Sequence, residues 1–71
     1  MAPTTDGQNM RYHVTISDSE NKKIRGRFFN SAVFAKQWAV DVFASNAQVA
    51  NAALWEDGIQ IATRQRDTDW R

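Results

Sequence analysis

The sequence predicts a small α+β domain of order ββαββ, in which one helix packs on one face of a four-stranded antiparallel sheet. Three observations lead to this fold class. Alternating apolar and polar residues flank a polar segment at residues 17–22, a later stretch repeats its apolar residues at helical spacing, and Asp57-Gly58 separates two further apolar stretches. A chain of 71 residues has room for one domain and no second core.

The first predicted hairpin joins strands at residues 11–16 and 23–29. Apolar residues recur at every second position in both strands, which is typical of a strand with one buried face. The Asp, Ser and Asn residues between the strands favour a reversal, because their side chains hydrogen-bond the nearby backbone. The residues expected to point inward are Tyr12, Val14, Ile16, Ile24 and Phe28.

Gly26 falls between Ile24 and Phe28 on this inward parity. A glycine inside a strand marks either a bulge or a close approach of another group. We expect one of two arrangements: an ordinary bulge, or the indole of Trp38 seated over Gly26.

The predicted helix covers residues 31–45. Asn30 or Ser31 supplies an N-cap, and Asn46 supplies a left-handed residue after the helix. Phe34, Trp38 and Val42 recur every four residues and predict the buried stripe, which Ala35, Ala39 and Phe43 flank. Val33 and Val40 fall on the opposite face and form a candidate patch for self-association.

The second predicted hairpin pairs residues 51–55 with residues 59–66. Asp57-Gly58 favours a tight turn, because both residue types accept a positive φ. Ile59 and Ile61 are expected to point inward with Leu54. Trp55 has two alternatives: a two-residue loop pairs it with Gln60 and exposes it, whereas a three-residue loop pairs it with Ile59 and buries it.

The domain is expected to span residues 10–66, with a disordered tail at residues 1–9 and a frayed end at residues 67–71. A single helix covers one face of a sheet, so the other face meets water or a partner. From the parity given above, that face carries His13 and Thr15 together with six of the nine basic residues, namely Arg11, Lys23, Arg25, Arg27, Arg64 and Arg66.

This arginine and aromatic face is the predicted binding surface. Its candidate partner-binding residues are Arg25, Arg27, Phe29, Trp55, Arg64 and Arg66. Arginine and aromatic side chains are enriched at protein interfaces, which favours docking onto a larger protein. The alternative without a binding role is that the charges on the strand faces only keep a small sheet soluble and prevent aggregation.

Composition limits the chemistry. With no cysteine and one histidine, we expect no disulfide, thiol catalysis, metal site or cofactor. His13 stands alone on its strand without a nucleophile or carboxylate pattern around it, so we expect no enzyme activity. No apolar run reaches the roughly 20 residues that cross a bilayer, and we expect a cytoplasmic protein without membrane contact.

We therefore expect a non-enzymatic binding module of the accessory, adaptor or inhibitor type. The alternative is a nucleic-acid-binding protein that uses the same basic face. The pI of about 8.2 and the acidic residues in the turns place that alternative second. So small a core is marginal alone, and a homodimer would supplement it.

Overall fold

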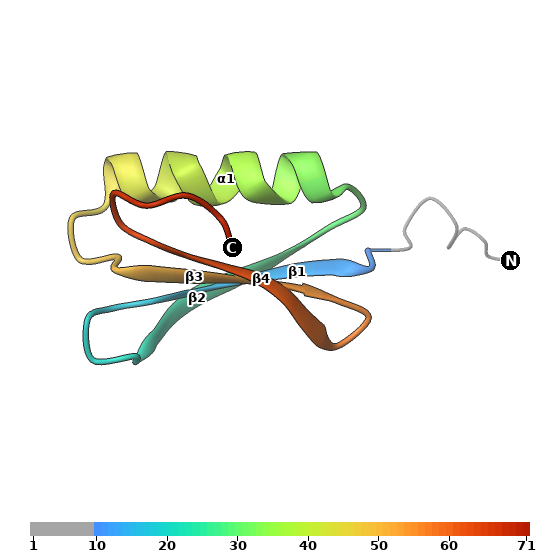
Figure 1. Ribbon diagram of the computed structural model, residues 1–71, viewed down its shortest axis with the longest axis horizontal. Coiled ribbons are helices and arrows are strands. Elements are labelled where there is room, and N and C mark those ends of the chain that lie inside the picture. Colours follow the sequence, from blue (N-terminus) through green and yellow to red (C-terminus); the bar gives the residue numbers. More distant parts are fainter. Residues whose placement is uncertain (1–9) are drawn as a thin grey trace, which may run out of the picture.

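Four strands and one helix make up the part of the chain that the computed structural model describes, residues 10–71 (Figure 1). In chain order they are β1 (Tyr12–Ser17), β2 (Lys23–Phe29), α1 (Ala32–Ser45), β3 (Asn51–Glu56) and β4 (Ile59–Gln65). The strands form one sheet in the order β2-β1-β3-β4, and all neighbours are antiparallel. The predicted ββαββ order and four-stranded sheet are confirmed. The predicted tail at residues 1–9 lies outside the described residues.

The core lies between α1 and the two central strands. The helix runs across one face of the sheet (Figure 1). A helix is about 10 Å wide and strands lie about 4.8 Å apart, so one helix covers about two strands. Because β1 and β3 are central, β2 and β4 extend past the helix on either side. The buried core residues are Val14, Ile16, Ala35, Ala39, Val42, Phe43, Val49, Ala52 and Leu54.

The helix turns a different side to the sheet than its aromatic spacing predicts. Its buried residues are Ala35, Ala39, Val42 and Phe43. Phe34, predicted to be inward, is 65% exposed. Small alanine side chains let the helix backbone lie close to the sheet, which moves the bulky Trp38 to the flank. There Trp38 packs against Phe29, with 5.6 Å between the ring centroids.

The ends of α1 follow the prediction in position but not in detail. Ser31 precedes the helix with extended dihedral angles, and its carbonyl accepts a hydrogen bond from Ala35 N. Asn46 is not left-handed, since its φ is −138°. Its N–H donates to Val42 O at 2.9 Å and continues the helical hydrogen bonding.

The side chains of β2 face the opposite way from the prediction. Arg27 pairs with Val14, and Arg25 pairs with Ile16. Directly paired residues of antiparallel strands share a face, so both arginines lie on the helix side of the sheet. Phe28 lies on the helix-free face and is 57% exposed. The inward placement of Phe28 and the outward placement of the two arginines were therefore wrong.

The β1–β2 turn explains this reversal. Asp18 Oδ1 accepts hydrogen bonds from the backbone N–H groups of Glu20 and Lys22, both at 2.9 Å. Where this turn joins the strands, the register shifts and leaves Ile24 without a paired residue. Ile24, also predicted to be inward, is 37% exposed. One such extra residue exchanges the two faces of everything that follows in the strand.

The β3–β4 turn settles the position of Trp55. Asp57 and Gly58 have φ values of 51° and 85°, which fit a two-residue turn of the type that hairpins favour. Trp55 consequently pairs with Gln60. Its side chain lies on the helix-free face, and the alternative with the indole in the core is wrong.

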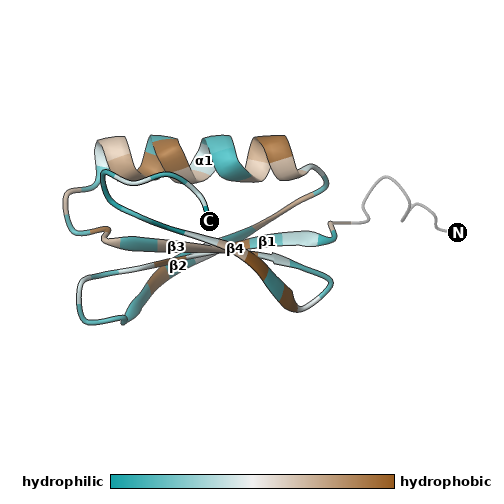
Figure 2. Cartoon of the chain, viewed as in Figure 1, coloured by the Kyte–Doolittle hydropathy of each residue, from teal (hydrophilic) through white to brown (hydrophobic). Residues whose placement is uncertain are grey.

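Two isoleucines of β4 also depart from the prediction. The pairing with β3 shifts between Leu54 and Trp55, and this shift leaves Ile61 as the extra residue. Ile59 and Ile61 are 68% and 47% exposed instead of inward. Figure 2 shows the same feature, because hydrophobic colour continues onto β4 beside its turn and away from the helix.

The end of the chain is folded back, although we expected residues 67–71 to fray. Arg71 and Thr63 exchange two backbone hydrogen bonds, at 2.9 and 3.2 Å. Trp70 packs against the core, and Lys36 Nζ lies 5.9 Å from its ring centroid. The C-terminal residues thus cover part of the outer edge of β4.

Candidate binding surface on the helix-free face

The arginines predicted for this surface lie on the other side of the sheet. On β2, the guanidinium of Arg25 lies 5.6 Å from the ring of Trp38, and that of Arg27 lies 5.3 Å from the ring of Phe29. Both stacks occur where β2 extends beyond the helix. An arginine suits this position because its stem covers apolar surface while its charge reaches water.

Arg64 on β4 and Arg66 directly after β4 have a similar position on the opposite flank of the helix. Arg64 lies 5.4 Å from the ring of Phe43. Arg66 donates hydrogen bonds to the carbonyl oxygens of Phe43, Asn46 and Val49, at 3.0, 2.7 and 3.0 Å. These carbonyls lie at and just beyond the C-terminal end of α1, where a cation is favoured. The geometry gives Arg66 a structural role.

Phe29 is likewise part of the fold. It is half-buried against the core and packs on Trp38. Of the six predicted partner-binding residues, Trp55 alone is on the helix-free face. The predicted arginine and aromatic face is therefore not a single surface, because Trp55 lies on the opposite side of the sheet from Phe29 and the arginines.

Three aromatic side chains form a row across the helix-free face. His13 on β1 pairs with Phe28 on β2 and with Trp55 on β3. The rings of His13 and Phe28 are stacked, with centroids 4.1 Å apart and planes 7° from parallel. Trp55 Nε1 donates to Thr15 Oγ1 at 3.1 Å, which holds the indole in place. We call Phe28, His13 and Trp55 the aromatic row.

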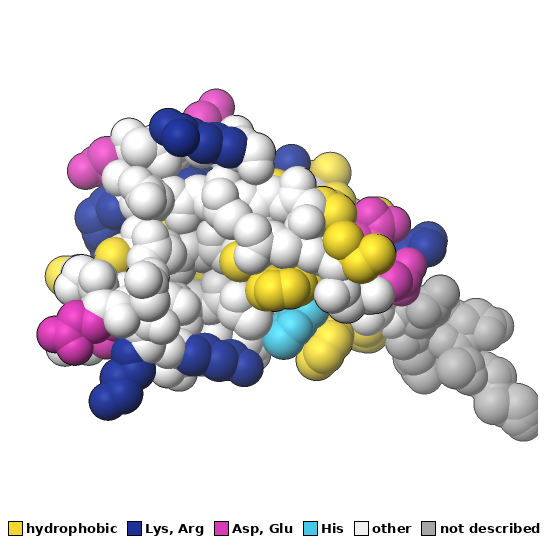
Figure 3. Space-filling model, turned by 60° about the horizontal axis from the view of Figure 1, so that its bottom comes forward, with side chains coloured by type: hydrophobic (Ala, Val, Ile, Leu, Met, Phe, Trp, Pro, Cys, Tyr) yellow, Lys and Arg dark blue, Asp and Glu magenta, His cyan; other side chains and the backbone are white. Residues whose placement is uncertain are grey.

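A depression of about 300 Å³ lies beside the aromatic row. Met10, which is 44% exposed, contributes to its wall. Arg11 stands at the rim, where its Nη2 lies 3.1 Å from Asp57 Oδ2 and its Nε lies 3.6 Å from Glu56 Oε2. Figure 3 shows hydrophobic side chains gathered around the histidine at this end of the face. The depression is apolar at its centre and carries paired charges at its edge.

Gly26 makes room for the aromatic row. A Cβ atom at this position would lie 2.9 Å from His13 Nε2 and 3.2 Å from Val14 O. The glycine is thus a site of close approach and not a bulge, since it pairs with Thr15 in regular register. The approaching group is the imidazole and not the indole of Trp38, which lies on the other side of the sheet.

The surroundings of His13 favour the neutral form of its imidazole. Partial burial lowers the pKa of His13 from its ordinary value of about 6.5, and the positive charge of Lys23 lowers it further. A neutral ring stacks on Phe28 without carrying a charge into the apolar end of the face.

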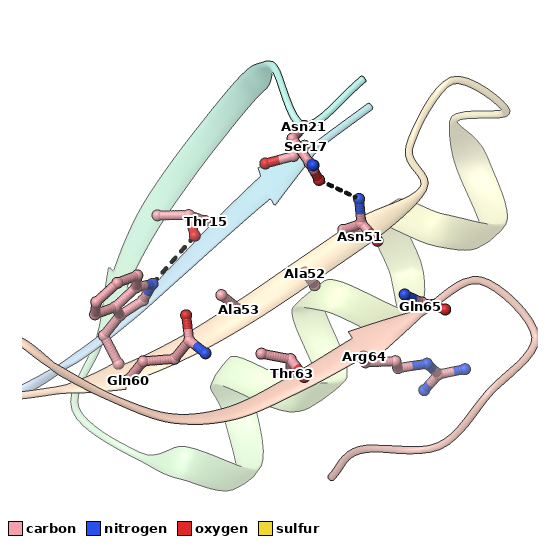
Figure 4. Close-up of a pocket in the computed structure, with 11 residues that line it drawn as sticks. Thr15, Ser17, Asn21, Asn51, Ala52, Ala53, Gln60, Thr63, Arg64 and Gln65 are labelled. Atoms are coloured by element: carbon pink, nitrogen blue, oxygen red, sulfur yellow. Dashed lines mark hydrogen bonds between the residues drawn. The ribbon is translucent and has the colours of Figure 1, made fainter. Parts of the chain in front are cut away.

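The rest of the helix-free face is polar, and Lys23 carries a charge there beside Gly26 and His13. A groove of about 380 Å³ runs from Trp55 toward the turn end of β1 (Figure 4). Small side chains such as Ala53 form its floor, and Asn51 Nδ2 donates to Asn21 Oδ1 at 3.1 Å at its far end. Gln60 and Thr63 add an amide and a hydroxyl. The face therefore changes from aromatic at one end to amide and hydroxyl groups at the other.

Sequence reasoning placed His13 and Thr15 on the correct face but missed Phe28 and Met10. The prediction assigned Phe28 to the core because it placed the even-numbered residues of β2 on the inward face. Gly26 was the available signal, since a missing side chain between two exposed positions leaves space for a cross-strand neighbour. The candidate self-association residues also differ from each other, because Val33 is 73% exposed and Val40 is half-buried.

The part of the chain that the structure describes offers little further chemistry. Within residues 10–71, no three His, Cys, Asp or Glu side chains gather in a way that would hold a metal ion. No helix in the same part of the chain is long and apolar enough to cross a membrane. Comparisons with protein-family models, curated proteins and solved structures gave no match. The function is therefore inferred from the surface itself.

Proposed function

We propose that the protein is a non-enzymatic binding module of the accessory, adaptor or inhibitor type, which docks a larger protein through the helix-free face. The observation that carries this proposal is the aromatic row with its exposed Phe28. Aromatic side chains dominate interface energetics, because they bury a large area at little entropic cost. The stack on His13 and the indole hydrogen bond of Trp55 order these rings before binding.

The size and charges of the depression indicate which kind of surface the partner presents. A cavity of about 300 Å³ accepts one large apolar side chain, and the paired charges of Arg11 with Glu56 and Asp57 suit a polar rim. The partner thus presents a protruding apolar residue inside a polar ring. Cytoplasmic location and the absence of a cofactor belong to the same proposal. A chain without cysteine needs no oxidising compartment for its stability.

Nucleic acid binding is the second candidate, supported by the row of rings as a base-stacking platform. Phosphate neutralisation needs cations beside the rings. The register puts Arg25 and Arg27 on the helix side, so the cations beside the row are Lys23 and Arg11, and Arg11 is already paired with Glu56 and Asp57. So few cations give few phosphate contacts, which ranks protein binding first. Titration with single-stranded DNA and RNA at low ionic strength is expected to show no saturable binding.

The test of the proposed function compares two phenylalanines. Phe28 and Phe34 are 57% and 65% exposed, but Phe34 lies on α1, away from the helix-free face. Tagged wild-type protein, Phe28→Ser and Phe34→Ser would be used to capture partners from the source cell, with quantitative comparison of each captured protein. Loss of a hot-spot ring weakens binding about tenfold or more.

We expect a partner that is retained by Phe34→Ser and lost by Phe28→Ser. Both variants should unfold at nearly the same temperature as the wild type, because neither ring is buried. A set of captured proteins that is the same for all three forms would contradict the proposal.

A further inference from the structure

The outer edge of β2 is an open template for another strand. β2 is the first strand of the sheet, with β1 on one side only. Every second residue of such a strand directs its backbone N–H and C=O away from the sheet. The opposite edge differs, since Arg71 already pairs with Thr63 of β4. Among the described residues, β2 therefore offers the longer uncovered edge.

The side chains of this edge select against a second copy of the same strand. Lys23, Arg25 and Arg27 are exposed along β2, and the ion pairs found within residues 10–71 involve only Arg11 among the cations. An antiparallel pair of β2 strands centred on Gly26 would put Arg25 opposite Arg27. Like charges directly opposite each other destabilise a pair of strands. The same two guanidinium groups attract carboxylates.

We propose that β2 accepts an extended acidic segment of a partner protein as a fifth strand of the sheet. This inference rests on the proposed function in that the ligand is a protein, and it adds the segment and its chemistry. Strand addition supplies affinity through main-chain hydrogen bonds and specificity through alternate side chains. An incoming strand would direct its acidic residues toward Arg25 and Arg27, on the helix side. Its alternate residues would be apolar and lie beside Phe28.

The arginines are positioned for this role before a ligand arrives. Stacking on Trp38 and Phe29, at 5.6 and 5.3 Å, restricts the guanidinium groups of Arg25 and Arg27. Residues i and i+2 of a strand are about 6.6 Å apart, so two carboxylates with the same spacing meet both arginines. The recognised segment is consequently one in which acidic and apolar residues alternate along the strand.

The test uses the whole chain, isotopically labelled, and synthetic capped peptides observed by NMR. An alternating Glu-Val peptide is titrated to about 1 mM, which detects weak specific binding. A peptide of the same composition with its glutamates and valines in separate blocks is the first control. We expect saturable shifts along β2 and slower exchange of its outward amides with the alternating peptide alone.

Charge variants provide the second control. Arg27→Glu and Lys22→Glu change the net charge equally, but Lys22 lies in the turn before β2. The combined variant Arg25→Glu with Arg27→Glu should weaken the Glu-Val peptide about tenfold or more, since two attractions become repulsions. Lys22→Glu should weaken it less than threefold, through long-range charge only. An alternating Lys-Val peptide should bind the combined variant better than the wild type.

Three outcomes would overturn the inference: no binding of the Glu-Val peptide, equal binding of the blocked peptide, or equal effects of Arg27→Glu and Lys22→Glu. The first outcome would leave the basic side chains only the role of keeping the edge from pairing. The other two would show that the peptide binds through net charge and not as an added strand. These failures differ from failure of the proposed function. A cellular partner that depends on Phe28 without any peptide binding would remove the edge inference alone, and peptide binding without such a partner would remove the face proposal alone.

Discussion

Replacement of Arg66 by methionine separates a structural arginine from a binding arginine. Arg66 donates three hydrogen bonds to carbonyl oxygens at the end of α1 and just beyond it, and its guanidinium lies 5.5 Å from the ring of Phe43. A hydrogen bond to a charged group contributes about 1.5–3 kcal/mol, but bonds that share one guanidinium are not additive. Methionine keeps most of the stem and loses all three bonds. We expect Arg66→Met to lower the free energy of unfolding by about 3 kcal/mol.

This loss is large for so small a chain. With 71 residues, a total free energy of unfolding of about 4–11 kcal/mol is typical. For a domain of this size, a loss of about 3 kcal/mol lowers Tm by about 12–24 °C. Thermal and urea unfolding, followed by circular dichroism, would measure the change. Arg66→Lys should recover part of it, because an ammonium group still reaches one of the carbonyls.

Arg27→Met is the matched control, since Arg27 also stacks on an aromatic ring but lies at the exposed edge. We expect it to change the free energy of unfolding by less than about 0.5 kcal/mol. Equal Tm values for Arg66→Met and the wild type would refute the capping role. In that case Arg66 would again be available as a partner-binding residue.

Two further predictions concern the aromatic row. Gly26→Ala should lower the free energy of unfolding by about 1–2 kcal/mol, because the added methyl would lie 2.9 Å from His13 Nε2 and must displace the ring. Urea denaturation measures this loss. The loss should be smaller when Gly26→Ala is made in a His13→Ala background, where the ring is absent. The lowered pKa of His13 means that the unfolded chain binds a proton more readily than the folded chain. The free energy of unfolding should therefore be unaffected by His13 above about pH 6.5 and should fall as the pH drops below that value. Urea midpoints measured between pH 7.5 and 5 should show this dependence of stability on pH, and the dependence should flatten in His13→Gln. An unchanged dependence in His13→Gln would assign it to other groups. NMR titration of Lys23→Gln should find a higher pKa for His13 than in the wild type.

The elements of the fold could be predicted because each has a local signal. Alternation identified the strands, a polar segment identified the first turn, and Asp57-Gly58 identified the second. These signals act over a few residues and depend little on the rest of the chain. They are sufficient to give the order ββαββ.

The faces could not be predicted, because they depend on single-residue choices that local patterns leave open. β2 has large apolar residues on both parities, Phe28 on one and Phe29 on the other, so alternation alone does not say which is buried. The register shift near Ile24 decides it. In α1, the aromatic spacing of Phe34 and Trp38 competes with the alanine face, and close packing on the sheet favours the alanines.

The same uncertainty about faces applies to the candidate binding surface. The prediction that four arginines share one side of the sheet was right in its grouping: Arg25 and Arg27 do have the same parity as Val14 and Ile16, which face the helix. It was wrong in choosing the helix-free side, because it took Ile24 and Phe28 as the inward residues of β2 and Ile59 and Ile61 as those of β4, and the register shifts in both hairpins change these faces. A helix that covers two central strands leaves a rim on each flank. Arginine suits such a rim, where an aromatic ring needs cover and water is near.

The two proposed surfaces meet at β2. Phe28 belongs to the aromatic row on one face, while its neighbours along the strand, Arg27 and Phe29, belong to the rim on the other. A strand added at this edge would contact both, because its own side chains alternate between the faces. A partner that combines an acidic, alternating strand with a protruding apolar residue would then bind the edge and the face together. Linked contacts of this kind raise affinity without requiring either to be strong, so mutation of Phe28 and of Arg27 should each weaken such a partner more than it weakens the isolated peptide.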